Sequence, residues 1–233
     1  SLGRALGEVR HGAPPLESMA RTERYMGSKT VLGLIGVVFL AMIALYVYLS
    51  GNVVAGVVAA VVMIIVGFFF ATVSGNLVGL IGSSNNPISG LTLSTLIIAA
   101  LLMVALGVSG SGGVAVVLGV AAVVCVSSAV AGELLQEFKA GYILGGTPRT
   151  IQIVELIAVV LASVVMYYPL YVLHVANIKA GGIGFGDAKL PAPQAGLMAT
   201  LAQGIVGGEM AWPLVICGAF FGLALVMIKV KSP

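Results

Sequence analysis

The residues best suited to chemistry in this sequence are uncharged polar side chains that interrupt a long apolar run. From Thr30 to Gly132 the chain contains no Asp, Glu, Lys, Arg or His, and inside this stretch residues 74–90 are polar and rich in glycine. Within hydrocarbon, unsatisfied backbone N–H and C=O groups are costly, so irregular chain persists only when enclosed by protein or beside water. These features predict a membrane protein that binds or conducts a solute.

Asn86 and Pro87 give this polar break a direction. Asn is a favoured N-cap and Pro a favoured first helical residue, so the pair predicts a helix starting at residue 87. Its free N–H groups and positive dipole end would then face the break. Ser83, Ser84, Asn85 and Asn86 would add donors and acceptors without fixed charge. The alternative is an ordinary loop outside the membrane followed by a capped helix.

Glu155 is the main ionisable candidate, because it lies on an otherwise apolar helix. Arg149, Gln152 and Glu155 are spaced by three, which places them on one side of that helix. A carboxyl group within a span can take up a proton and is a natural coupling site. The alternative is an interfacial glutamate in contact with Arg149 or lipid headgroups. We interpret His174 as a solvated loop histidine rather than a proton relay.

Two further polar residues follow near the end of the chain. Glu209 is a second candidate for proton coupling if residues 191–208 enter the membrane and return, or it caps the helix that follows. Gln194, in the first turn after Pro193, is a better candidate for a cavity residue than Gln203.

The elements that must position these residues are membrane-spanning helices. Hydrophobic residues make up 60% of the chain and charged residues 8%, against roughly 25% charge in an average soluble domain. We expect an all-α polytopic transmembrane helix bundle with at least six spans and one or two re-entrant or broken helices. The expected spans are about 31–49, 53–73, 87–106, 114–130, 148–173 and 211–228, with a candidate re-entrant helix at 191–206.

Residues 1–29 form a polar tail or linker before the transmembrane domain of residues 30–233. This tail carries five Lys and Arg residues, so the positive-inside rule predicts that it lies in the cytoplasm. We expect the rest of the chain to lie in the cell membrane. The net charge of +3 is scattered over segment ends, which argues against nucleic acid. No Ser, Thr or Cys has the partners of a catalytic or metal site, so we expect neither an enzyme nor a cofactor.

Three motifs resemble one known family. Residues 76–90 resemble the signature of the oligopeptide transporter superfamily, which includes the yellow-stripe metal-chelate transporters. Residues 133–149 resemble that family's cytoplasmic connection, and residues 190–204 its helix bearing Pro and Gln. The connection departs from the family pattern, since it begins with Glu133 rather than Asp and its Lys is displaced. Together the motifs cover roughly residues 30–230.

The resemblance implies secondary active uptake of oligopeptides or metal chelates, usually driven by protons. The partners would be the peptide or chelate substrate, protons, the lipid bilayer, the remainder of a longer transporter chain and, as a further candidate, a second copy in a homo-oligomer. The candidate substrate-binding residues are Asn76, Ser83, Ser84, Asn85, Asn86 and Gln194. The alternatives are a channel-type pore, with residues 83–86 as an uncharged filter, and an accessory subunit that transports nothing itself.

Overall fold

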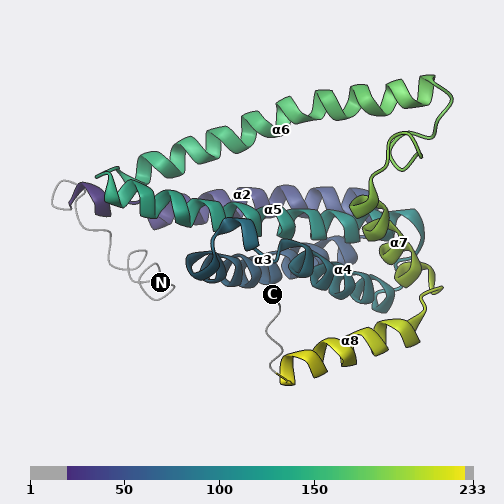
Figure 1. The fold of residues 1–233 in the computed structure, drawn as a ribbon. Helices are drawn as coiled ribbons and strands as arrows, with labels where there is room; N and C mark the ends of the chain where they lie inside the picture. The colour runs from purple at the N-terminus through teal and green to yellow at the C-terminus, as the bar shows by residue number, and fades with distance from the viewer. Residues whose placement is uncertain (1–19, 229–233) are drawn as a thin grey trace.

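The computed structural model describes residues 20–228, which form a bundle of α-helices without any named strand in that range (Figure 1). The predicted all-α class is confirmed. The first nineteen residues of the predicted tail lie outside the described residues. The elements are η2 (Arg21–Glu23), α2 (Ser28–Ser50), α3 (Val53–Ile81), η3 (Ser83–Asn85), α4 (Ile88–Ala105), α5 (Gly110–Ile143), α6 (Pro148–Lys179), α7 (Pro193–Gly207) and α8 (Trp212–Met227).

Five helices of the described chain are long and apolar enough to cross a membrane. They are α2 to α6, and α8 is apolar but shorter. A transmembrane helix needs about 20 predominantly apolar residues, which these five exceed or closely approach. The chain is therefore an integral membrane helix bundle.

Three helices run further than the expected spans. α3 continues to Ile81, α5 to Ile143 and α6 to Lys179. In α5 the helix continues past the apolar run because the residues that follow include Glu, Leu, Gln and Lys, which are strong helix formers. The charged connection expected after residue 130 is therefore mostly the last turns of α5.

α5 lies at the centre of the bundle and packs against α2, α3, α4 and α7. Its Val116, Val117, Val120 and Val124 are fully buried. Glycines allow close contact elsewhere: a Cβ added to Gly75 of α3 would lie 2.6 Å from Leu135 Cδ1 of α5. Small residues at such crossings are how membrane helices approach closely.

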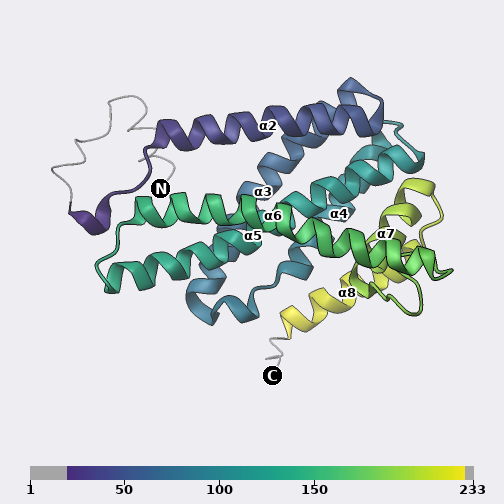
Figure 2. The same cartoon turned by 90° about the horizontal axis from the view of Figure 1, so that it is seen from above.

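The helices run between two ends of the bundle, as Figure 2 shows. The charged end holds the start of α2, the last turns of α5 and the start of α6, with Lys29, Glu133, Glu137, Lys139 and Arg149. The loop end holds the turns at residues 51–52 and 106–109 and the loop 180–192. α7 stays at the loop end, and α8 returns toward the charged end.

α6 and α8 lie on the outside of the bundle (Figure 1). Pro148 is the only buried residue of α6, and α8 has none within its described range. Both helices therefore present most of their apolar side chains outward.

Candidate functional site

The polar break is shorter than the sequence suggests. α3 continues through Asn76, whose side chain is exposed, so only residues 82–87 separate α3 from α4. Ser83, Ser84 and Asn85 form the exposed turn η3. The predicted Asn86 cap is wrong, because Pro87 holds the N-cap position of α4 and no side chain caps it.

Asn86 instead turns back toward α3 and α5. Its Nδ2 donates to Ser74 Oγ at 2.7 Å and, more weakly, to the Ser128 carbonyl oxygen at 3.5 Å. Ser74 Oγ donates to the same carbonyl at 2.5 Å. We call Ser74, Asn86 and Ser128 the polar cluster. It ties the break to both neighbouring helices.

The polar cluster depends on close packing with α5. Gly132 lies one turn after Ser128, and a Cβ there would be 2.9 Å from Asn86 Nδ2 and 2.8 Å from Val78 Cγ2. Ser74 and Ser128 are fully buried. The spacing of Ser128 and Gly132, two small residues four apart, indicates a helix contact, but the sequence alone does not assign Ser128 to the site.

Two buried atoms of the polar cluster have no hydrogen-bond partner in the described structure. They are Asn86 Oδ1 and Ser128 Oγ. Ser74 Oγ donates its hydrogen to the Ser128 carbonyl and therefore cannot donate to Asn86 Oδ1. Asn86 Oδ1 is left as a free acceptor. A buried polar group left unpaired costs about 1–3 kcal/mol. The cluster can therefore accept a hydrogen bond at Asn86 Oδ1, and Ser128 Oγ can donate or accept one.

Ser74 and Ser128 lie in the halves of α3 and α5 that are nearer the charged end. Ser128 is about 27 Å along α5 from Gly110, and Ser74 is about 32 Å along α3 from Val53, at 1.5 Å per residue. The hydrocarbon core of a bilayer is about 30 Å thick. α3 continues about 10 Å beyond Ser74 to Ile81, so the break turns back toward the bundle to bring Asn86 to Ser74.

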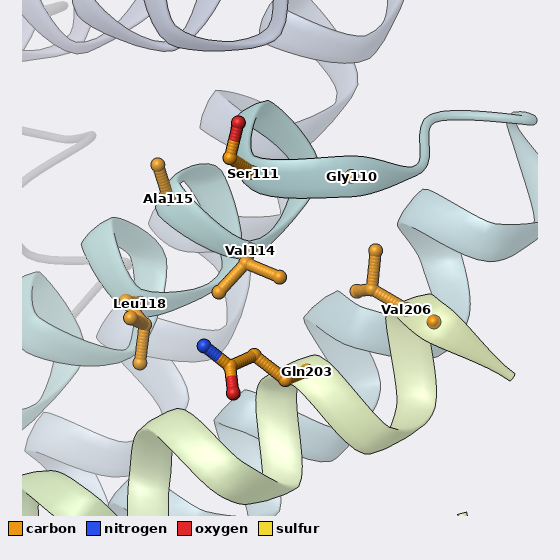
Figure 3. A pocket seen from close by; sticks show the side chains of 8 residues that line it. Gly110, Ser111, Val114, Ala115, Leu118, Gln203 and Val206 are labelled. Atoms are coloured by element: carbon orange, nitrogen blue, oxygen red, sulfur yellow. The ribbon is translucent and has the colours of Figure 1, made fainter. Parts of the chain in front are cut away.

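A second polar position lies at the loop end. A pocket of about 460 Å³ opens between the start of α5 and α7, and Gln203 directs its amide into it toward Val114 and Leu118 (Figure 3). Gln203, Val206 and Gly207 line one side, at the three- and four-residue spacing of a helix face. This spacing is present in the sequence, from which Gln194 is the expected cavity residue.

Gln194 and Glu209 are both exposed and lie at opposite ends of α7. The structure does not bring either of them to the polar cluster, since α7 stays at the loop end (Figure 2). Glu209 does not cap α8, whose N-cap residue is Ala211 without a side-chain cap bond. The interpretation of Glu209 as a cap is therefore wrong.

Glu155 is half-buried and lines an apolar groove of about 880 Å³ between α2, α3, α5 and α6. Gln152 lines the same groove, and its Oε1 accepts a hydrogen bond from Met26 N at 2.7 Å. The backbone N of Arg149 donates to Arg24 O at 2.8 Å. The segment before α2 is thus hydrogen-bonded to the start of α6, directly beside Glu155.

The loop between α6 and α7 is anchored on the last turns of α6. The N–H of Phe185 donates to His174 Nδ1 at 3.3 Å, and the two rings stack with centroids 5.6 Å apart. Asn177 Oδ1 accepts from Gly184 N at 2.8 Å. His174 is therefore a residue of α6 that holds the loop, and not the solvated loop histidine expected from the sequence.

Asp187 organises the same loop from within. Its carboxylate accepts hydrogen bonds from Lys189 N at 2.9 Å and from Ile183 N at 3.3 Å. These backbone donors, first Lys189 and then Ile183, lower the pKa of the Asp187 carboxyl from its ordinary value. Hydrogen bonds to the charged form have this effect because they favour ionisation.

The chain is similar in sequence to known membrane transport proteins. The family model for OPT oligopeptide transporter proteins matches residues 11–233. A putative oligopeptide transporter of Haemophilus influenzae is 30% identical over 185 residues, covering 74% of this chain and 29% of that protein. A probable metal-nicotianamine transporter of Arabidopsis thaliana is 30% identical over 105 residues, covering 44% of this chain and 14% of that protein. The chain spans less than a third of the length of these relatives, and no solved structure matches it significantly.

Proposed function

Because the chain belongs to the oligopeptide transporter family, we propose that it forms part of a secondary transporter for oligopeptides or metal chelates. Members of this family are transporters rather than enzymes. The family resemblance inferred from the three motifs is confirmed. The names of the two relatives cover both substrate classes, a peptide and a metal–nicotianamine complex.

The observation that carries this proposal is the pair of unpartnered buried atoms in the polar cluster. A peptide unit has one N–H and one C=O, which complement Asn86 Oδ1 and the Ser128 hydroxyl. Both protein groups are uncharged, so they suit substrates that vary in side chain and net charge. We assign the substrate path to the break, with Asn86 as its central contact and Ser83, Ser84, Asn85 and Asn76 as exposed contacts at its edge.

The position of the polar cluster toward the charged end supports a role near one end of the proposed path. The tail before α2 and the charged end are cytoplasmic under the positive-inside rule. The cluster would then stand at the cytoplasmic exit of a carrier in the cell membrane. Gln194 would meet substrate at the loop end, on the opposite side.

Glu155 is the proposed site of proton coupling. It is the ionisable side chain in the groove, about 10 Å from the start of α6. A carboxyl in apolar surroundings can become neutral by binding a proton, which couples its charge to the state of the helices around it. Glu209, exposed at the loop end, is the second candidate.

The test uses the full-length transporter in proteoliposomes, with a panel of peptides and metal chelates and an imposed proton gradient. Replacing Asn85 and Asn86 together with Leu should abolish uptake while the protein remains in the membrane. The control is Ser163→Leu, at an exposed position of α6 whose hydroxyl bonds only within its own helix. Normal uptake by the double variant would overturn the assignment of the site.

Coupling is tested separately with Glu155→Gln. This variant should lose uptake driven by the proton gradient but keep exchange of internal for external substrate, because exchange does not need net proton movement. Gradient-driven uptake at the normal rate would exclude Glu155 as the coupling residue. Rapid passive conductance by the wild type would instead indicate a channel.

A further inference from the structure

The groove beside Glu155 has a composition unlike that of a site for a polar solute. Apart from Gln152, Glu155 and Ser127, its lining side chains are apolar and come from four membrane-spanning helices and the residue Met26 before them. Gln152 and Glu155 belong to the first two turns of α6, so its ionisable part lies toward the charged end. A groove with one polar end and an apolar remainder fits an amphipathic molecule.

The length of the groove corresponds to one leaflet of a bilayer. Its lining on α2 runs from Val31 to Phe39 and on α5 from Leu134 to Ala122, which are about 12 and 18 Å along the helices. Half of the hydrocarbon core is about 15 Å. The groove therefore starts at the charged end and stops near mid-depth, as an acyl chain does.

The charges around the polar end are mixed in sign. Glu155 is near enough to Glu137 and Glu133 of α5 to be repelled by their negative charges. Lys29, in the first turn of α2, and Arg149, in the first turn of α6, lie within about one turn of the nearest lining residues and are exposed. A headgroup with an ammonium and a phosphate complements both sets, since the ammonium relieves the repulsion among the carboxylates.

We propose that the groove between α2, α3, α5 and α6 is a binding site for a zwitterionic aminophospholipid of the leaflet at the charged end. The acyl chains lie along α2 and α5 beneath α6. The ammonium lies toward the carboxylates of Glu133, Glu137 and Glu155, and the phosphate toward Lys29 and Arg149. The bound lipid fills the space between α6 and the bundle, so α6 moves against lipid rather than against packed side chains.

The experiment uses the full-length protein, purified in mild detergent with phosphatidylethanolamine and phosphatidylglycerol in equal amounts, and native mass spectrometry to count retained lipids. The wild type should retain phosphatidylethanolamine in preference. Ala122→Phe, which fills the groove from α5, should lose one bound lipid relative to Ala41→Phe, a matched change at an exposed position of α2 outside the groove. Equal retention by the two variants, or no preference between headgroups, would overturn the proposal.

A second measurement decides the matter if Ala122→Phe does not fold. A structure of the wild-type protein with phosphatidylethanolamine brominated in its acyl chains should show bromine density between α5 and α6. A protein helix or empty solvent at this position would contradict the assignment.

Discussion

Gly132 sets how closely Asn86 approaches α5. We predict that Gly132→Ala displaces Asn86, because the new methyl group would be 2.9 Å from Nδ2. Overpacking of this kind costs about 1–3 kcal/mol, and uptake should fall with it. The control is Gly79→Ala on α3, where a Cβ meets nothing within 4 Å. Thermal unfolding of the full-length protein in detergent, with uptake in proteoliposomes, measures both effects.

The two serines of the polar cluster should respond differently to alanine. Ser74→Ala removes the shorter hydrogen bond of Asn86 Nδ2 and the side-chain hydrogen bond from Ser74 to the Ser128 carbonyl, which should lower the free energy of unfolding by about 1–3 kcal/mol. Ser128→Ala removes only a hydroxyl that has no partner, so stability should not fall. Its effect should be a higher KM for uptake. Equal destabilisation by both changes would show that the Ser128 hydroxyl has a partner.

At the level of residues, the sequence located the polar side chains but could not supply their partners. The preference of Asn for an N-cap is a local rule, and it failed at Asn86 because two helices distant in sequence offer a buried serine and a carbonyl instead. The loop-end pocket shows the same limit. Both glutamines were visible in the sequence, but only tertiary packing places Gln203 rather than Gln194 beside α5.

In the loop of residues 180–192, the carboxylate of Asp187 accepts hydrogen bonds from two backbone N–H groups. The lowered pKa of this carboxyl means that its contribution is fully present above its ordinary pKa and is lost as the pH falls through the lower, folded value. We predict that Asp187→Ala increases hydrogen exchange at Ile183 and Lys189 at neutral pH. The wild type should reach the same exchange, corrected for intrinsic rates, only in strong acid.

The matched test of this loop is at Gly184, which has a φ of +89° and whose Cβ would meet the His174 ring. Gly184→Ala should therefore loosen the contact between Phe185 and α6. The comparison variant is Gly196→Ala in α7, where nothing lies within 4 Å of the added Cβ. Unchanged exchange at Phe185 in Gly184→Ala would contradict the anchoring role of His174.

Helix existence was easier to predict than helix length. Apolar runs located the described helices, since a bilayer demands apolar side chains over its own thickness. They did not locate the ends of α3, α5 and α6. In α5 the helix continues past the apolar run because Glu, Leu, Gln and Lys are good helix formers. The loop around Asp187 could not be predicted either, since its hydrogen bonds depend on glycine conformations.

Across the whole molecule, the order of helix directions fixes which segments share a side of the membrane. The last turns of α5, which include Ala140, and the loop between α6 and α7, which includes Ala188, belong to opposite ends of the bundle (Figure 2). We predict that an impermeant maleimide on intact cells labels Ala188→Cys but not Ala140→Cys. Both cysteine variants are made in the full-length protein after Cys125 and Cys217 have been replaced, so that these thiols do not react. Labelling of both positions would show that α6 does not cross the membrane.

The exposed faces of α6 and α8 also concern the molecule as a whole. The relatives are more than three times as long as the matched segment, and more than half of the side chains on these helices are exposed in the described structure. Composition indicates that such faces are apolar, but it does not distinguish a face that meets lipid from one that meets another helix. The resemblance to a longer family was therefore needed to interpret them.

The connection between Asn86 and Ser128 also constrains how the protein is made. Ser128 follows Asn86 by 42 residues, and a ribosome adding about 5–20 residues per second needs about 2–8 s to synthesise them. During that interval α3 and the break exist without the α5 carbonyl that later binds both Ser74 and Asn86. A break close to the membrane surface can remain hydrated while it waits, whereas one at mid-depth would have to bury its amide unpaired.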